Sequence, residues 1–190
     1  AYTDVVTRDQ VPVALPELRT GARQIVSLQP GVEVIDFTGD LGWRADHLDA
    51  RKPQRDNILK ISNDGRNASL DPRMAHLGTP TQSRAAEVAE RAIEVQRRLA
   101  DRQYHDRDTG ELLPARGPLQ LMFCDRGTPS KDPRQFTIYQ AIKDELVARG
   151  MPPEAVRFVH ATRNSAQLHA LLPPCHRRQV AVLILSTDKN

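Results

Sequence analysis

Three short apolar runs mark the last third of the chain. They lie at 119–124, 155–159 and 180–185 and are bounded by polar residues or proline. Runs of this length are typical of β-strands, and a run that is apolar at every position, such as 180–185, suits a parallel sheet covered on both faces. The pattern predicts an α/β fold in which residues 117–190 form a parallel β-α-β-α-β unit with right-handed crossovers.

Amphipathic segments lie between these runs. A helix is expected from Asp132, a good N-cap before a proline, to Gly150, which is placed to end it. Its apolar side consists of Phe136, Tyr139, Ile142 and Leu146. Asn164 or Ser165 would cap a second, shorter helix, which the two prolines after Leu172 are expected to stop.

The upstream part, residues 31–116, is predicted to be a largely helical extension. Its clearest helix covers 83–103, where apolar residues recur at steps of three and four opposite glutamates and arginines, and where Ser83 is a candidate N-cap. The apolar stripe consists of Ala85, Val88, Ala92, Val95 and Leu99. A weaker helical stripe, interrupted by glycines, covers 32–50.

Breaks are expected in the rest of the upstream part. The polar stretch 52–82 indicates short helices interrupted at 63–65, and 104–117 indicates a charged hinge region. Residues 1–30 combine an irregular, proline-containing arm with a predicted strand at 23–28, where β-branched residues are bracketed by a glycine and a proline.

Composition narrows the class of protein. The 27 Lys+Arg and 24 Asp+Glu leave a formal charge of +3 over 190 residues, which excludes a histone-like protein but leaves room for a modest basic face. Hydrophobic residues make up 39% of the chain, below the usual range of about 45–50%, so the core is expected to be lean.

Targeting and redox signals are few. No apolar run approaches the length of a membrane span and no signal segment is visible, so we expect no membrane partner. Cys124 and Cys175 lie far apart without metal-ligand spacing, and a reduced, cytoplasmic compartment is the expectation. The start without Met and the end directly after an apolar run suggest a piece of a longer protein.

Candidate chemistry is concentrated in three loops, because ligands of open parallel sheets bind at the carboxyl ends of the strands. The loops are 125–131, 160–164 and 186–190, and they are rich in hydroxyls, amides and charge. Such side chains contact phosphate backbones, although polar loops are also ordinary on protein surfaces. The candidate nucleic-acid-binding residues are Asp125, Arg126, Thr128, Ser130, Lys131, His160, Thr162, Arg163, Ser186, Thr187 and Lys189.

Motifs of enzymes are missing from this stretch of sequence. It contains no GxxxxGK[ST], GxGxxG, GxSxG or HExxH, and no catalytic or metal-ligating residue is assigned. Cys124 is expected to be a core residue, and Cys175 with His176 a surface turn. The acidic residues Asp56, Asp64 and Asp71 are expected to cap helices or pair with Lys60, Arg66 and Arg73, with cation binding as the alternative.

Four stretches carry a resemblance to a known family. LQLMFCDRGTPSKD (119–132), AVRFVHATRNSAQ (155–167) and VAVLILSTDKN (180–190) resemble the second RecA-like lobe of Swi/Snf-type superfamily-two helicases. The closest likeness is to phage- and plasmid-borne helicase proteins often described with an adenine-specific DNA methylase. DNILKISNDGRNASLDPRM (56–74) matches the same group with its D-N-x-L-K and D-G-R-x-A-x-L-D-x-R pattern.

The resemblance implies a domain organisation. Residues 1–30 would be an inter-lobe arm and strand, because VPVALPEL (11–18) resembles the segment that links the two lobes, and the strand at 23–28 would join the sheet. Residues 31–116 would be a helical extension. Residues 117–190 would be a RecA-like lobe, similar to P-loop NTPases without a P-loop of its own and incomplete at the C-terminus.

The resemblance also implies roles for the loops. Residues 125–130 stand at helicase motif IV, which touches the nucleic-acid backbone, and 186–189 at the start of motif V, which faces DNA and the ATP cleft. Leu185 departs from the group, which often has Gly there. The arginine finger of motif VI and the first lobe with its Walker motifs lie outside this stretch, so ATP and Mg²⁺ would belong to the parent protein and the fragment alone would be inactive.

The expected partners are DNA, bound weakly and without sequence preference, and the missing first helicase lobe. A dimer through an open sheet edge is a further possibility. Two other functions stay open: a non-enzymatic α/β interaction module of a phage or plasmid protein, and a small α/β enzyme. Salt-dependent DNA binding would separate the helicase fragment from the interaction module.

Overall fold

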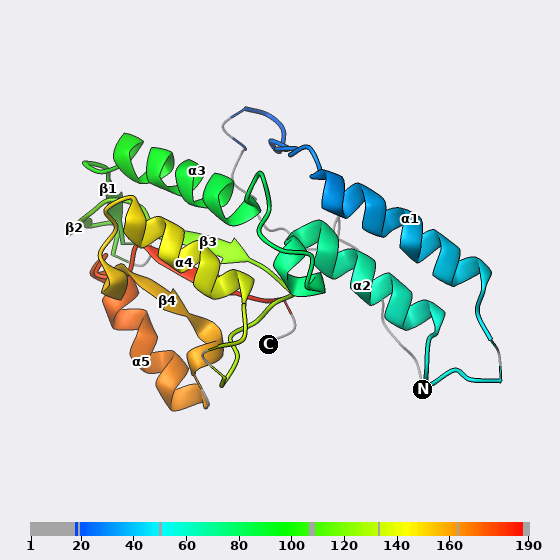
Figure 1. Cartoon of the computed structure of the whole chain (residues 1–190). Helices are drawn as coiled ribbons and strands as arrows, with labels where there is room; N and C mark the ends of the chain where they lie inside the picture. The colour runs from blue at the N-terminus through cyan, green and yellow to red at the C-terminus, as the bar shows by residue number, and fades with distance from the viewer. Residues whose placement is uncertain are drawn as a thin grey trace, which may run out of the picture.

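A three-stranded parallel sheet forms the centre of the C-terminal part (Figure 1). The computed structural model describes residue 18 and residues 20–49, 51–106, 109–132, 134–162 and 164–187. The strands stand in the order β3-β5-β4, with Gln120 and Val156 both opposite Val182, and both pairings are parallel. The predicted α/β class and parallel sheet are confirmed. The strands are β3 (Gln120–Phe123), β4 (Val156–Phe158) and β5 (Val182–Leu185).

Two helices cover the sheet and complete the core. In Figure 1, α4 (Ile138–Ala148) lies over the strands and α3 (Arg84–Arg98) lies beside it. The face of α3 toward the core consists mainly of alanines, which allow the two helix backbones to come close. The buried cluster joins Ala85, Ala89, Ala92 and Ile93 of α3 to Ile138, Tyr139, Ile142 and Leu146 of α4 and to Val182 and Ile184 of β5.

The N-terminal extension contains a helical hairpin of α1 (Val32–Asp46) and α2 (Ile58–Leu70), followed by the 3₁₀ helix η2 (Pro72–Ala75). The predicted break at 63–65 is wrong, because α2 continues through it. A side chain at Gly65 would come within 3.1 Å of Leu41 Cδ1 on α1, so this glycine allows close helix packing.

Partly buried ion pairs hold the helical hairpin together. Arg44 of α1 donates hydrogen bonds to Asp56 at 2.7 Å and to Asp64 at 2.9 Å. The hydrogen bond from Arg44 stabilises the ionised carboxylate of Asp56 and is the main cause that lowers the pKa of Asp56. The expected partners Lys60 and Arg66 are therefore wrong for these two carboxylates, whereas Asp71 pairs with Arg73 as expected, at 2.7 Å.

Boundaries around α3 differ from the prediction. Ser83 is confirmed as its N-cap, accepting a hydrogen bond from the backbone N–H of Ala86 at 3.3 Å. The helix ends at Arg98, before the predicted end, because the chain turns into an antiparallel hairpin of β1 (Gln103–His105) and β2 (Leu112–Arg116). The hairpin occupies the predicted charged hinge region.

The helix after β3 starts later than predicted. Asp132 accepts a hydrogen bond from the N–H of Arg134 at 3.0 Å, so it closes a local turn. Thr137 is the N-cap of α4, which leaves Phe136 outside the helix, where Arg73 stacks on its ring at 4.1 Å. Gly150 is confirmed just past the helix end, with a left-handed φ of +94°.

The helix that follows β4 passes through its prolines. Asn164 caps α5 (Ser165–His176), which continues beyond Leu172 through Pro173 and Pro174. The predicted stop is wrong: each proline removes one backbone donor, but its fixed φ suits a helix, and the bonds past the prolines persist, with the N–H of Arg177 donating to the carbonyl of Pro173 at 3.0 Å. Cys175 is buried in that last turn and is not part of a surface turn.

The outer edge of the sheet is more exposed than the sequence suggested. Among the described strands β3 pairs with β5 alone. Leu121 and Phe123 are 54% and 60% exposed, so one face of this strand is solvated. The strand predicted at 23–28 is absent: these residues pair with no described strand, and Ile25 is 75% exposed. The β-branched pattern there finds no packed surface that would turn it into a strand.

No helix in the described ranges is both long enough and apolar enough to cross a membrane. The expected arm at 1–17 lies outside the described residues, as does Pro133.

Tyr139 provides a test of the core. We expect Tyr139→Phe to lower the free energy of unfolding by about 1 kcal/mol, because the Cys124 carbonyl loses the hydrogen bond that the phenol donates at 2.6 Å. Urea titration measures the change. Burial raises the pKa of Tyr139 to about 12, whereas an unfolded tyrosine ionises near about 10. The stability of the wild type should therefore decrease as the pH rises from about 10 to about 12, and its advantage over the variant should shrink. A difference that stays constant with pH would contradict the assignment.

Candidate nucleic-acid interface

The loops after β3 and β5 are joined by a charged contact at the carboxyl edge of the sheet. Oδ1 of Asp125 accepts hydrogen bonds from the backbone N–H of Thr187 at 2.7 Å and from its hydroxyl at 2.8 Å. These two bonds lower the pKa of Asp125, with the backbone bond as the larger cause. Asp125 thus acts as a link between loops, and its carboxylate faces Thr187.

A second contact joins the loops after β4 and β5. The hydroxyl of Ser186 lies 3.2 Å from Nε2 of His160, and the His160 ring meets Tyr139 edge-on at 5.3 Å between centroids. A serine beside a histidine is a familiar nucleophile arrangement, but Ser186 is only 4% exposed. Substrate has no ready access to its hydroxyl, so the pair serves to hold the two loops together.

Arg126 extends the site toward the helical hairpin. Its guanidinium donates to Oδ1 of Asn63 at 3.0 Å and to Oδ1 of Asn67 at 3.3 Å, both on α2. A hollow of about 660 Å³ opens at this contact and is lined by Arg66, Asn67, Asp125, Arg126 and Gly127. Because the partners of Arg126 are neutral amides, its positive charge is not cancelled by them.

The α2 residues of this contact were missed by the sequence prediction. Asn63 and Asn67 are four residues apart, a spacing that places them on the same side of a helix. The spacing carries this signal only if 58–70 form one helix, and the expected break at 63–65 concealed it. Arg66 was predicted to be a carboxylate partner and instead lies at the hollow.

The other predicted residues contribute in different ways. Ser130 accepts from the N–H of Asp132 at 3.1 Å and donates to Gln135, so it shapes its own loop. Thr162 donates to the carbonyl of Val159 at 2.7 Å. Thr128 and Lys131 are exposed. Arg163 and Lys189 lie outside the described residues.

Gly127 is required by the backbone of the first loop. Its φ is +62°, a region that residues with a Cβ rarely adopt. A Cβ here would come within 2.9 Å of Cγ2 of Ile138 and 3.1 Å of Cε of Met74. Gly127 therefore lets η2 and α4 pack closely against the loop.

The remaining chemical candidates have structural roles. Burial raises the pKa of the Cys124 thiol, and its Sγ lies 3.2 Å from the carbonyl of Arg126, which suits a packed residue better than a nucleophile. Within the described ranges no three His, Cys, Asp or Glu side chains gather as a metal site requires. The acidic residues of 56–71 are engaged by arginines, as described above.

The carboxyl edge of the sheet can position an anionic ligand and offers it positive charge. It joins loops from three parallel strands through two contacts, and it carries a half-buried cation at Arg126 and an exposed one at Lys131. Comparison of the chain with protein-family models, curated proteins and solved structures finds no match. The function is therefore argued from the residues and their geometry.

Gly127→Ala tests the packing of the first loop. We expect it to lower the free energy of unfolding by at least about 1–2 kcal/mol, because a left-handed residue with a Cβ is strained and Ile138 must also move. Gly39→Ala is the matched control: a Cβ at Gly39, in the interior of α1, meets nothing within 4 Å. That change should be neutral or stabilise by up to about 1 kcal/mol. Equal effects of the two changes would contradict the packing role.

Asp125→Ala tests the link between the first and third loops. The backbone N–H of Thr187 should exchange with solvent roughly tenfold faster, because it loses a charged acceptor. Hydrogen exchange followed by NMR measures this. Since the folded pKa of Asp125 is lowered, the link is present at neutral pH and disappears as the pH falls through that pKa. Asp132→Ala, whose carboxylate caps a separate turn, should leave Thr187 unchanged.

Proposed function

We propose that this chain is part of the second RecA-like lobe of a Swi/Snf-type superfamily-two helicase and that its carboxyl-edge loops contact a nucleic-acid backbone. The observation that carries the proposal is the contact of Asp125 with Thr187. It joins two stretches, 125–130 and 186–187, that resemble helicase motifs IV and V. In a helicase both motifs must face the same strand of nucleic acid, and here they share one edge of the sheet.

The parallel sheet supports the same proposal. In α/β folds, ligands bind outside the carboxyl ends of the strands, and the three loops there come from β3, β4 and β5. The stretch with the D-G-R-x-A-x-L-D-x-R pattern forms α2 and η2, and its asparagines hold Arg126 of the motif IV stretch. Two stretches that carry the resemblance are thus in direct contact.

The contribution of these residues is positioning and charge. Arg126 is held by two neutral amides, which do not neutralise its charge, so its guanidinium can still attract a phosphate. Lys131 is exposed a few residues away. In the parent protein ATP would supply the energy that closes the two lobes. The Walker-type phosphate loop that would hold ATP and Mg²⁺ is not among these 190 residues, and no step of hydrolysis is assigned to this chain.

A non-enzymatic interaction module is the second candidate. The exposed Leu121 and Phe123 on β3 favour it, because an edge strand with apolar side chains invites pairing with another chain. The same edge is the place for the dimer that the sequence suggested. An interaction module of this kind has no need of salt-dependent DNA binding, which separates the two functions.

The decisive experiment is a DNA-binding titration of the full chain at several salt concentrations. Each phosphate contact should lower log K by about 0.7–0.9 per log unit of salt. Arg126→Ala with Lys131→Ala should weaken binding to all sequences alike and reduce the salt slope by roughly two such contacts, because phosphate contacts carry no base readout.

A matched control removes two exposed cations elsewhere. Arg51→Ala with Lys52→Ala alters the connection between α1 and α2 and should leave both the affinity and the slope nearly unchanged. If the two double variants lose affinity equally, or if wild-type binding is insensitive to salt, the assignment of the 125–131 loop to a nucleic-acid backbone is wrong.

A further inference from the structure

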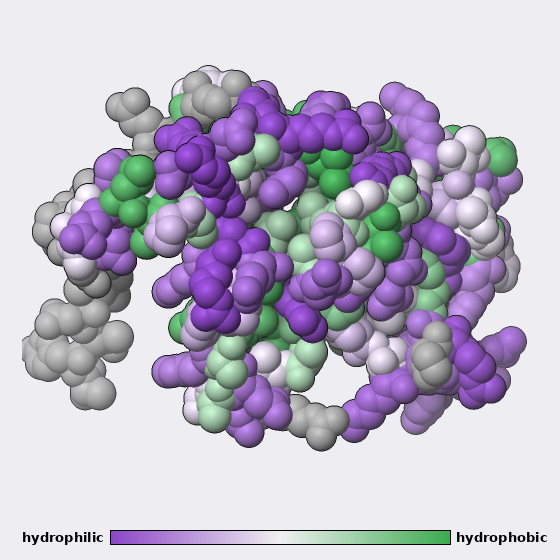
Figure 2. Space-filling model, turned by 90° about the vertical axis from the view of Figure 1, so that its left-hand side faces the viewer, coloured by the Kyte–Doolittle hydropathy of each residue, from purple (hydrophilic) through white to green (hydrophobic). Residues whose placement is uncertain are grey.

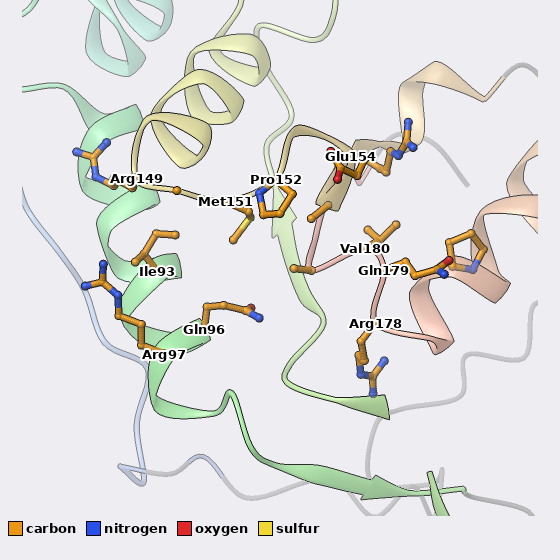
Figure 3. A pocket seen from close by; sticks show the side chains of 15 residues that line it. Ile93, Gln96, Arg97, Arg149, Met151, Pro152, Glu154, Arg178, Gln179 and Val180 are labelled. Atoms are coloured by element: carbon orange, nitrogen blue, oxygen red, sulfur yellow. The ribbon is translucent and has the colours of Figure 1, made fainter. Parts of the chain in front are cut away.

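A second hollow lies at the opposite end of the sheet, by the amino ends of β4 and β5. It has a volume of about 720 Å³, within the range of about 300–1,000 Å³ that is usual for small-molecule sites. Figure 3 shows Arg97 and Arg149 on one side and Arg178 on the other, with Ile93 and Met151 toward the middle. Seen from this end of the molecule, hydrophilic surface surrounds smaller apolar areas (Figure 2).

The lining of this hollow is strongly cationic. It contains four arginines and one carboxylate, Glu154. The arginines come from four places in the fold: the last turn of α3, the end of α4, strand β4 and the turn before β5. They are Arg97, Arg149, Arg157 and Arg178. The formal excess of the whole chain is only +3, so this one hollow concentrates positive charge that the rest of the surface balances.

Only one of these arginines has a carboxylate partner in the described ranges. Arg149 forms an ion pair with Glu145 on α4. Arg97 and Arg157 are exposed, and no hydrogen bond or ion pair to either side chain is found among the described residues. Arginine presents a planar fork of donors that matches phosphate. The exposed side chains of Arg97 and Arg157 form the rim of the hollow and offer two such groups.

Arg178 is held in place at unusual backbone cost. Its φ is +58°, a left-handed conformation that a residue with a Cβ adopts only under constraint. Its Nε donates to the carbonyl of Gly117 at 3.1 Å and its Nη1 to the carbonyl of Cys175 at 3.0 Å. The guanidinium carbon also lies 5.1 Å from the ring centroid of Tyr104. All these partners are neutral, so the positive charge of Arg178 is held in place without a carboxylate partner among the residues that the structure describes.

The floor of the hollow is apolar. Ile93, Met151 and Val180 are 8%, 6% and 2% exposed, and Ala181 and Pro152 adjoin them. A simple inorganic anion would use the arginines and leave this floor unused. The combination fits a ligand that has a flat or apolar body and phosphate groups.

We propose that this hollow binds a nucleoside phosphate, with the base against the floor of Ile93, Met151 and Val180 and the phosphates at Arg97, Arg157 and Arg178. The same chemistry is offered by a free nucleotide and by the phosphorylated end of a nucleic-acid strand. The site is independent of the proposed function, because it lies at the amino ends of the strands and shares no lining residue with the 125–131 loop.

Calorimetric titrations test the site on the full chain with three probes: ATP, pyrophosphate and adenosine. ATP should bind most tightly, because it alone uses both rim and floor. Arg97→Gln with Arg157→Gln should weaken ATP binding by about tenfold or more, because two charge-assisted phosphate contacts are lost. Both side chains are exposed, so the fold should be retained. Equal affinity of the wild type and this variant for ATP would overturn the proposal, as would the failure of all three probes to bind.

Two controls separate this site from others. Arg51→Gln with Arg55→Gln removes the same charge from the connection between α1 and α2 and should leave ATP affinity unchanged; an equal loss would show that net charge alone is responsible. The Arg126→Ala, Lys131→Ala variant should also bind ATP normally, even if it fails to bind DNA.

A further arm distinguishes the two sources of the ligand. A 5′-phosphorylated oligo-dT that competes with ATP and is weakened by the pocket variant identifies a strand end. An oligonucleotide that does not compete identifies the free nucleotide. Either result retains the site, provided that the pocket variant loses ATP affinity.

Discussion

The arrangement of the carboxyl edge depends on one buried phenol. Tyr139 is fully buried in α4 and donates a hydrogen bond to the carbonyl of Cys124, where β3 ends. Its ring also meets Phe158 of β4 and His160 just after it, at 5.6 Å and 5.3 Å. One side chain thus fixes the helix against the ends of two strands. These contacts of Tyr139 position the loops at 125–131 and 160–162. The contact of Ser186 with His160 then positions the third loop relative to the second.

The sheet was predictable because its signal is local and strong. A strand that is apolar at every position, such as 180–185, has few alternatives in a short α/β segment, and β5 indeed lies at the centre of the sheet. The segment at 23–28 has similar β-branched residues, but strand formation also needs a partner and a packed surface. Gly65 shows the opposite case: glycine suggested a break, yet the approach of Leu41 gives it a packing role inside a helix. Such outcomes depend on residues distant in sequence.

In the candidate site, too, the local features could be predicted and the long-range contacts could not. The three loops were predictable from a general rule about parallel sheets, whereas the partners of individual side chains were not. Arg126 finds its acceptors about sixty residues upstream, on a helix whose continuity the local pattern concealed. Asp125 was expected at a nucleic-acid backbone, but a carboxylate there would repel phosphate; its bonds to Thr187 give it a structural task in which the negative charge is useful.

The two ends of the sheet use arginine differently, and the difference is electrostatic. At the carboxyl edge Arg126 stands beside Asp125, so the local field is mixed, and the proposed binding there would depend on an extended polyanion that collects several weak contacts. At the amino end three arginines, which have no carboxylate partner among the described residues, surround an apolar floor, and this suits a compact ligand held by few strong contacts. Salt should therefore weaken the two interactions to different extents, because each phosphate contact adds to the salt dependence and an extended strand makes more such contacts than a compact ligand.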